Sequence, residues 1–253
     1  MPKRLPLPWL AAGQALPATE SAWGHGSQAP GLLAAGGDLS VPALHQAYSA
    51  GVFPWFSEGQ PILWWSPDPR MVLEVANFQM RRSLKRTLQK FRADEACKVQ
   101  IDTSFSRVIE ACATSPRAGQ DGTWIVPEMV RAYRDLHRAG HAHSVETWID
   151  GRLVGGLYCV SLGQAVFGES MFSVESDASK IALSALVCFC RHHGIAWIDC
   201  QQNTSHLATL GAGELPRVRF LALLSRAVRQ EAPHWHFEPL YWDELLPSRP
   251  SRT

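Results

Sequence analysis

The sequence predicts a mixed α+β protein made of two unequal parts, residues 1–67 and 68–253. The first part is rich in Gly, Pro and Trp and shows a single strong helix signal. The Pro-rich stretch 66–69 then disfavours helix and favours an extended connection. From residue 70 onward, apolar strands and helices of ordinary composition succeed one another, so the boundary between a small N-terminal β-rich domain and a larger α/β domain is placed at residue 67.

The helix signal in the first part covers residues 41–50. Ser40 is a good N-cap, Pro42 suits a first turn and Gly51 suits the position after the last turn. We therefore expect one helix that begins after Ser40 and stops at Gly51.

The second part shows both strand and helix periodicities. We expect strands at 71–75, 98–101, 144–149, 152–161, 164–172 and 195–198, and helices at 80–91, 105–113, 127–139 and 178–193. Asp150-Gly151 predicts a tight hairpin turn. Asp177 or Ser176 should cap the last of these helices, and Gly194 should end it. Pattern alone indicates a mixed α/β sheet.

Composition limits the classes of function. The chain has 253 residues, 46% of them hydrophobic, and a formal charge of +1. A nucleic acid would therefore have to bind a local basic patch. The helix 80–91 offers one, because Arg82, Lys85 and Arg86 fall on a single face. A solvated helix face is the alternative interpretation of these three residues.

Several special environments are disfavoured. Prolines interrupt the apolar residues of the N-terminus, which does not suit a secretory signal, and no run is long enough to span a membrane. The six cysteines lack a disulfide framework, which indicates a reducing cytoplasm. No metal is expected: Cys188 and Cys190 fall on different helix faces, and Gly140 separates His137 from His141.

Three polar residues are candidates for chemistry. Asp199 follows the expected strand 195–198, and Gln201 alternates with it, so a carboxylate and an amide could reach one bound amine. Asp199 could instead cap the turn 202–204. Glu169 lies inside an apolar alternating strand, where a charge needs a partner. An internal cation such as Lys180 or Arg217 could be that partner.

Five blocks of sequence carry a resemblance to a known family. They are GLLAAGGDLS (31–40), AYSAGVFPWF (47–56), ILWWSPDPR (62–70), FGESMFS (167–173) and AWIDCQQNTSHLATLGAGELPRVRF (196–220). Together they resemble the leucyl/phenylalanyl-tRNA–protein transferase family. The resemblance implies an N-acetyltransferase-like fold for 68–253 and a monomeric cytoplasmic enzyme without a cofactor. It would move Leu or Phe, and also Met, from aminoacyl-tRNA to the N-terminal Arg or Lys of a protein, creating a degradation signal.

The same resemblance assigns roles to residues. Asp199 would hold and polarise the attacking amine directly or through Gln201, Gln201 could also donate to the developing oxyanion, and Glu169 would be the counter-charge for the acceptor's side chain. The donor pocket would be lined by Leu157, Leu183, Leu186 and Ile198, with ordinary core packing as the alternative. The terminal adenosine would contact Trp55 and Trp124, and the acceptor-stem phosphates would contact Arg82, Lys85 and Arg86. Trp64 and Trp65 would seal the interface between the domains.

The sequence disfavours two other functions. An acyl-CoA transferase of this fold needs a glycine-containing loop for the pyrophosphate, whereas 173–180 contains no glycine and two acids. An RNA-binding module without turnover is disfavoured by the presence of Asp199, Gln201 and Glu169. The loop 114–122 is longer than the family pattern. About the first 30 and last 15 residues carry no assignable motif.

Overall fold

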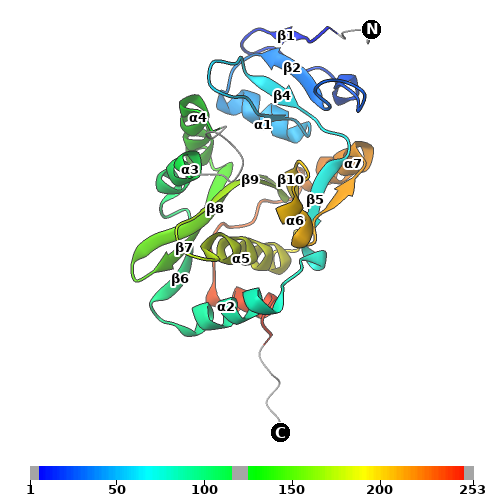
Figure 1. Ribbon diagram of the computed structural model, residues 1–253. Helices are drawn as coiled ribbons and strands as arrows, with labels where there is room; N and C mark the ends of the chain where they lie inside the picture. Colours follow the sequence, from blue (N-terminus) through cyan, green and yellow to red (C-terminus); the bar gives the residue numbers. More distant parts are fainter. Residues whose placement is uncertain (1–5, 116–124, 248–253) are drawn as a thin grey trace.

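The computed structural model describes residues 6–115 and 125–247 and contains two β-sheets (Figure 1). The smaller sheet has the strand order β1-β2-β4-β3. Its strands are β1 (Trp9–Leu10), β2 (Leu32–Gly36), β3 (Phe53–Pro54) and β4 (Leu63–Trp65). β1 pairs parallel with β2, and the other pairs are antiparallel.

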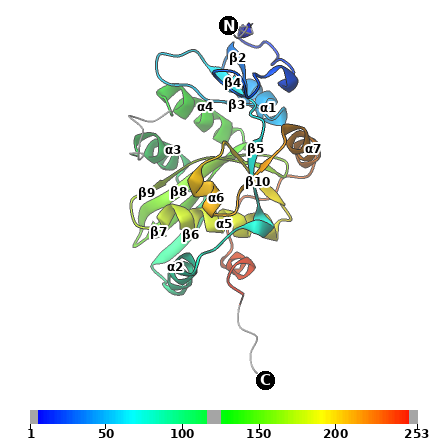
Figure 2. The same ribbon diagram turned by 45° about the vertical axis from the view of Figure 1, so that its right-hand side comes forward.

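The larger sheet has seven strands in the order β11-β5-β10-β9-β8-β7-β6. They are β5 (Arg70–Glu74), β6 (Cys97–Ile101), β7 (Ala142–Ile149), β8 (Arg152–Leu162), β9 (Ala165–Ser173), β10 (Trp197–Gln201) and β11 (Gly213–Leu215). Only β9 and β10 pair parallel within this described sheet. This pair lies near the middle of the molecule in Figure 1, and Figure 2 shows the same sheet after a 45° turn.

Helices cover the larger sheet on both faces. The α-helices are α1 (Val41–Ser49), α2 (Arg82–Ala93), α3 (Phe105–Thr114), α4 (Pro127–Arg138), α5 (Ala178–His192), α6 (Ser205–Thr209) and α7 (Arg217–Ala227), with short 3₁₀ turns at Thr19–Ser21, Val75–Asn77 and Pro239–Glu244. Alternation along β8 shows the two faces. Tyr158 and Val160 pack with α1, α3 and α4, whereas Leu157 and Cys159 pack with α5.

Local signals in the sequence are confirmed where they act over a few residues. Ser40 Oγ accepts from Ala43 N at 3.4 Å at the start of α1. Asp150 and Gly151 both have positive φ in the β7–β8 hairpin, and Gly194 has φ 70° after α5. The mixed α/β character is confirmed as well. No described helix is long and apolar enough to cross a membrane.

Two local expectations were wrong. α2 begins at Arg82 rather than at residue 80. Asp177 occupies the N-cap position of α5, but it has φ 63° and its side chain makes no capping bond. Instead, Ser179 N donates to Ser173 Oγ at 3.2 Å, and Asp177 pairs with Lys180 at 2.6 Å. A residue from the preceding strand thus satisfies the helix start.

The C-terminal segment 237–246, for which no motif was assigned, packs on α5 and reaches α2. Phe237, Tyr241 and Trp242 are buried there in one cluster with α5. Arg92 at the end of α2 donates to Leu246 O at 3.1 Å and pairs with Asp243 at 2.8 Å. This segment therefore holds α2 against the rest of the molecule.

Candidate active site

The candidate site lies where β9 and β10 stop pairing. Their parallel register covers two positions, Ile198 with Val166 and Asp199 with Phe167. The expectation that Asp199 follows a strand 195–198 was wrong: β10 runs from Trp197 to Gln201, so Asp199 lies in its middle. Gln201 is the last residue of β10 and therefore lies at its carboxyl end, beside the adjacent stretch of β9.

Both strands are irregular at this point. On β9, the register with β8 shifts between Gly168 and Ser170, which leaves Glu169 as the extra residue. On β10, the register with β5 shifts between Asp199 and Gln201, and Gln201 has φ 63°. Such bulges change the direction of individual side chains and often lie next to functional sites. Here they bring together Glu169 and Gln201, which belong to different strands.

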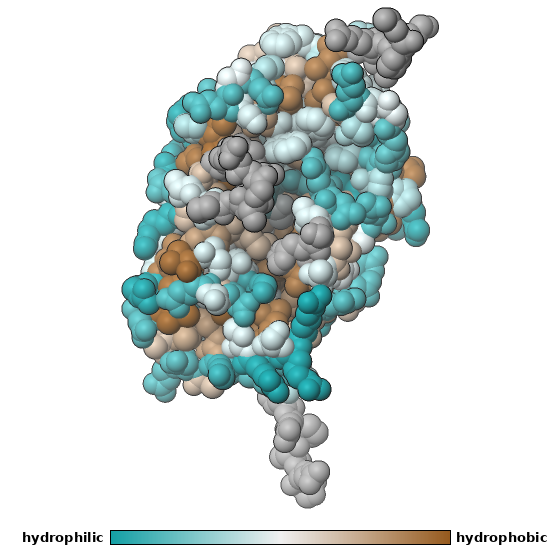
Figure 3. All heavy atoms as spheres, in the orientation of Figure 1, coloured by the Kyte–Doolittle hydropathy of each residue, from teal (hydrophilic) through white to brown (hydrophobic). Residues whose placement is uncertain are grey.

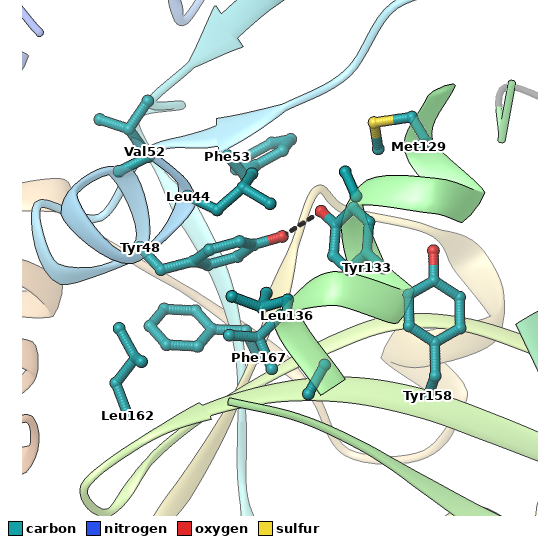
Figure 4. Close-up of a cluster of buried hydrophobic side chains, with 14 of the residues drawn as sticks. Leu44, Tyr48, Val52, Phe53, Met129, Tyr133, Leu136, Tyr158, Leu162 and Phe167 are labelled. Atoms are coloured by element: carbon teal, nitrogen blue, oxygen red, sulfur yellow. Dashed lines mark hydrogen bonds between the residues drawn. The ribbon is translucent and has the colours of Figure 1, made fainter. Parts of the chain in front are cut away.

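Glu169 is held by three side chains from separate elements. Tyr48 of α1 donates to Oε1 at 2.7 Å, Gln201 Nε2 donates to the same oxygen at 2.8 Å, and Tyr133 of α4 lies 3.4 Å from Oε2. The two tyrosine hydroxyls are also hydrogen-bonded to each other, pointing across the gap between α1 and α4 (Figure 4). The sequence did not indicate either tyrosine.

The alternative partners considered for Glu169 lie elsewhere. Lys180 binds Asp177, and Arg217 Nη1 donates to the carbonyl of Ser66 at 2.6 Å. Among the described residues, the side chains hydrogen-bonded to Glu169 are thus two tyrosines and an amide, and none of these three is a cation.

Burial raises the pKa of Glu169 from 4.5 to about 7. Hydrogen bonds from Tyr48 and Gln201 oppose this effect, and the negative charge of Asp199 adds to it. Glu169 is half-buried rather than sealed. A carboxylate with this pKa can take up and release a proton near neutrality, which is what a general base requires.

Asp199 is bound by two residues of the protein, Arg70 and Gln201. Its carboxylate forms a two-point contact with Arg70: Nε lies 2.8 Å from Oδ1 and Nη2 lies 2.7 Å from Oδ2. Both side chains are buried, with 1% exposed for Arg70 and 0% for Asp199. Asp199 does not cap the turn 202–204 but accepts from Gln201 N at 2.9 Å. In this geometry both oxygens of the Asp199 carboxylate are hydrogen-bonded to other groups of the protein.

Arg70 is a functional candidate that the sequence reasoning missed. It opens the strand RMVLE, in which three buried apolar residues follow it. A charge at the start of a buried strand is costly unless it is paired, and that signal pointed to a buried carboxylate partner. The partner is 129 residues away, so spacing alone could not identify it.

The four residues expected to line the donor pocket do come together. Leu157, Leu183, Leu186 and Ile198 belong to one cluster under α5 and are 1–5% exposed. Leu157 lies opposite Met171 of β9, which is half-buried. These residues belong to the cluster on the face of the sheet opposite Tyr48 and Tyr133.

The aromatic candidates fall in different regions. Trp55 is half-buried and packs edge-on against Trp65, with ring centroids 5.5 Å apart, while Trp65 Nε1 donates to Trp55 O at 2.7 Å. Trp64 is buried and donates to Gly36 O at 2.9 Å within the small sheet. Trp124 lies outside the described residues.

α2 presents the expected basic face. Arg82, Lys85 and Arg86 are exposed, whereas Leu84 and Leu88 are buried beneath them. No ion pair found among residues 6–115 and 125–247 involves these three cations. α2 lies at the lower end of the molecule, where hydrophilic side chains gather (Figures 1 and 3).

The histidines make protein contacts. His137 Nδ1 lies 2.8 Å from Ala142 O, and His143 Nδ1 lies 2.7 Å from Asp102 Oδ2. Within the part of the chain that the structure describes, no three His, Cys, Asp or Glu side chains are grouped so that they could hold a metal ion.

Comparison with known proteins identifies the family. A family model described as leucyl/phenylalanyl-tRNA protein transferase matches residues 72–225, and a model of that family's N-terminal domain matches residues 37–68. The leucyl/phenylalanyl-tRNA–protein transferase of Polaromonas sp. (strain JS666) is 62% identical over 241 residues, covering 95% of this chain and 94% of the relative. That of Burkholderia pseudomallei (strain 668) is 51% identical over 247 residues, covering 98% and 97%.

These matches define the protein as an aminoacyltransferase. The chain belongs to the leucyl/phenylalanyl-tRNA–protein transferase family. A solved structure of a functionally unknown conserved protein from Staphylococcus epidermidis covers 73% of this chain and 68% of its own, with a TM-score of 0.36 and 8% identity, too distant to bear on the fold.

Proposed function

We propose that this protein transfers Leu or Phe, and also Met, from aminoacyl-tRNA to the N-terminal Arg or Lys of acceptor proteins. The observation that supports this most directly is the carboxylate of Glu169, half-buried beside Gln201 where β9 and β10 diverge, with a pKa of about 7. The new N-terminal residue would act as a degradation signal. Because charged tRNA is a cytoplasmic substrate, we place the reaction of the monomeric protein there.

In the proposed mechanism, Glu169 receives the proton of the acceptor's α-ammonium group. The amine nitrogen then attacks the ester carbonyl, the C–N bond forms and the C–O bond to the ribose breaks. Glu169 passes this first proton to solvent. It then takes the second proton from the attacking nitrogen and gives it to the departing ribose oxygen, which leaves a neutral amide N–H and an ionised Glu169. Gln201 has two N–H groups; one donates to Glu169 at 2.8 Å, and the other is available to the oxyanion. The reaction requires no cofactor, because the ester supplies the driving force.

This mechanism changes the role expected of Asp199. Its two oxygens are occupied by Arg70 and its side chain is buried, so we no longer place it on the attacking amine. Glu169, expected as a counter-charge for the acceptor's side chain, takes the role of proton acceptor. The alternative is a direct contact of Glu169 with the Arg or Lys side chain of the acceptor. Comparing acceptor peptides with different first residues distinguishes the two roles.

The donor would bind through its side chain and its tRNA. We propose that Leu157, Leu183, Leu186 and Ile198 form the wall of an apolar donor pocket, entered between β9 and β10 beside Met171. Leu and Phe offer only apolar area and shape for recognition, which fits such a wall. Trp55, together with Trp124, would stack on the terminal adenosine. Arg82, Lys85 and Arg86 would bind acceptor-stem phosphates.

We also propose that the chain divides at residue 67 and that 68–253 follows an N-acetyltransferase-like plan. The smaller sheet ends at Trp65 and the larger begins with β5 at Arg70, which supports the division. A run of antiparallel strands ending in one parallel pair that diverges, with α5 crossing between its two strands, supports the plan.

Transfer assays with purified protein test the function. The donors are labelled Leu-tRNA, Phe-tRNA and Leu-CoA, and the acceptors are one peptide beginning with Arg and the same peptide with an acetylated N-terminus. We expect product from both charged tRNAs with the free peptide only. The loop 173–180 offers no cradle for a pyrophosphate, so Leu-CoA should give none. Thioester use without any need for tRNA would refute the proposal in favour of an acyl-CoA transferase.

A further inference from the structure

Arg70 is a buried cation that binds Asp199, two residues before Gln201 of the candidate site. It is the first residue of β5, and each guanidinium nitrogen has an acceptor: Nε and Nη2 bind Asp199, and Nη1 donates to Gly51 O at 3.1 Å. The guanidinium also lies against two aromatic rings, 4.8 Å from the centroid of Phe53 and 4.7 Å from that of Phe220. These contacts compensate for burial of its charge and hold it in one orientation.

Asp199 connects Arg70 to Gln201. Its Oδ1 accepts both Arg70 Nε and the backbone N–H of Gln201, at 2.8 and 2.9 Å. Gln201 has φ 63°, a conformation that residues other than glycine adopt at a cost and keep only where surrounding contacts enforce it. The Asp199 carboxylate supplies one such contact, and its own position depends on Arg70.

The Gln201 conformation in turn directs its side chain. Because the register shifts after Asp199, Gln201 no longer follows the alternation of β10, and its Nε2 reaches Glu169 at 2.8 Å. We propose that Arg70 is a positioning residue for aminoacyl transfer: by holding Asp199 it keeps the Gln201 carboxamide against Glu169. This inference rests on the proposed function, in which Glu169 and Gln201 act on the reacting groups.

A purely structural role for Arg70 is the competing explanation, because removing one member of a buried ion pair destabilises a fold. A matched control is Arg191, a half-buried arginine of α5 that donates to Val75 O at 2.6 and 2.9 Å and to Glu244 O at 2.9 Å. It anchors the chain by backbone contacts outside the candidate site, so its loss should affect stability and leave turnover per folded molecule unchanged.

The test uses four variants of the full-length protein: Arg70→Met, Arg70→Lys, Arg191→Met, and the double variant Arg70→Met with Asp199→Leu. Transfer from Leu-tRNA to an Arg-initiated peptide is measured between pH 5.5 and 9, below each variant's thermal midpoint. The readouts are kcat, KM for each substrate, and the pH at the midpoint of the acidic limb, where kcat rises with pH. The double variant replaces the ion pair by apolar groups, which proteins often tolerate well.

The ionisable groups that face Glu169 make the pH readout interpretable. They are Tyr48 on α1, Tyr133 on α4, Cys159 on β8 and Asp199 on β10. Burial raises the pKa values of both tyrosines and of the cysteine well above their ordinary range, so these three stay neutral over the assay range. Asp199 is the group among them whose cationic partner the Arg70 variants remove or replace.

We expect Arg70→Met to lower kcat at least tenfold with little change in KM for Leu-tRNA. Its acidic limb should move to higher pH, because the unneutralised Asp199 opposes ionisation of Glu169. In the double variant, the pH midpoint of the acidic limb should equal the wild-type value or lie below it, while kcat stays low. Arg70→Lys should keep the limb near its wild-type position and recover only part of kcat, since an ammonium lacks the two-point fork.

Other outcomes would contradict the inference. If the Arg70 variants keep wild-type kcat and pH dependence, or lose no more turnover than Arg191→Met at equal loss of thermal midpoint, Arg70 is structural only. If Arg70→Met does not fold, the double variant and Arg70→Lys still decide: normal turnover in the double variant would overturn the inference. Absence of transfer by the wild-type protein would instead refute the proposed function.

Discussion

Gln201 Nε2 lies 2.8 Å from Glu169 Oε1, although β10 and β9 cease to pair before either residue is reached. Each of the two lies at a register shift, one against β5 and the other against β8. A regular strand would have continued the alternation and directed these side chains elsewhere. The candidate site therefore depends on two local irregularities that meet at one point.

Transfer should depend on the ionisation of Glu169. Since burial raises its pKa to about 7, kcat of the wild-type protein should rise as the pH passes through about 7. Glu169→Gln should lower kcat on the order of 10²–10⁴-fold and remove this limb. Acceptor amines also titrate, at about pH 7.7–8.0, so both proteins are assayed with the same peptide and compared. Identical pH profiles would show that Glu169 is not the proton acceptor.

The same substitution separates proton transfer from recognition of the acceptor's side chain. If Glu169 binds an Arg or Lys side chain, Glu169→Gln should raise KM for an Arg-initiated peptide and leave KM for an Ala-initiated peptide unchanged. We expect instead a comparable loss of kcat with both peptides, because the α-amine is common to them. A change confined to KM of the Arg-initiated peptide would favour the counter-charge role.

Glu169→Gln should also stabilise the protein at high pH. In the folded state the carboxyl keeps its proton up to about pH 7, whereas a free carboxyl releases it near 4.5, so the folded protein loses stability as the pH rises through that interval. A glutamine does not titrate, and its oxygen can still accept from Tyr48 and Gln201. A difference of one in pKa corresponds to about 1.4 kcal/mol. The free energy of unfolding of Glu169→Gln, relative to that of the wild type, should therefore increase by up to roughly 3 kcal/mol as the pH rises.

Urea unfolding of both proteins at pH 5 and pH 8 measures this gap. The free energy of unfolding of Glu169→Gln should exceed that of the wild type by more at pH 8 than at pH 5. A constant difference between the two pH values would indicate that Glu169 ionises normally in the folded protein.

Replacing Arg82, Lys85 and Arg86 by Ala should raise KM for full-length aminoacyl-tRNA and reduce its dependence on salt, with kcat little changed. Each lost phosphate contact lowers the logarithmic salt slope by about 1. A short aminoacyl-adenosine donor, which cannot reach α2, should be used normally. The matched control is the triple Ala variant of Arg219, Arg226 and Arg229, which are exposed at or just beyond α7. Equal effects of both triple variants would show that the α2 cations act through the overall charge of the protein and not through specific phosphate contacts.

Leu183→Ala should change the choice of donor. Leu183 is 5% exposed in the cluster under α5, and enlarging a donor pocket there should favour Phe over Leu. A difference of one methylene is worth about 1–3 kcal/mol, so the ratio of kcat/KM for Phe-tRNA to that for Leu-tRNA should rise at least about fivefold. Val187→Ala, a truncation in the same helix and cluster, is the control for general loosening. An unchanged ratio in Leu183→Ala would place the pocket elsewhere.

The parts of the fold that could be predicted are those decided by neighbours in sequence. The cap at Ser40, the turn at Asp150-Gly151 and the helix end at Gly194 each depend on one residue's φ or one short-range hydrogen bond. Asp199 shows the limit. A strand in its segment could be inferred, but the residue that binds its carboxylate, Arg70, is 129 residues away.

The same limit applies to Glu169. The sequence indicated that a carboxylate in an apolar strand needed partners, and it suggested cations because they are the usual ones. The partners are two tyrosines and an amide, brought together by α1, α4 and a bulge in β10. Hydrophobic periodicity explains why Tyr48 and Tyr133 are buried, but it says nothing of which hydroxyl meets which carboxylate. Trp124 lies outside the described residues, so its role remains a prediction.

Tyr48 belongs to α1, in the first part of the chain, whereas Glu169 belongs to β9 of the second. A fragment that began at residue 72, where the longer family model starts, would lack that hydroxyl, and it would also lack Arg70 together with its contacts Gly51 and Phe53. The larger sheet is therefore not a detachable catalytic core. A shortened form of the enzyme, or a graft of the candidate site onto another scaffold, would have to include the N-terminal segment, because that segment supplies contacts to Glu169 and Arg70.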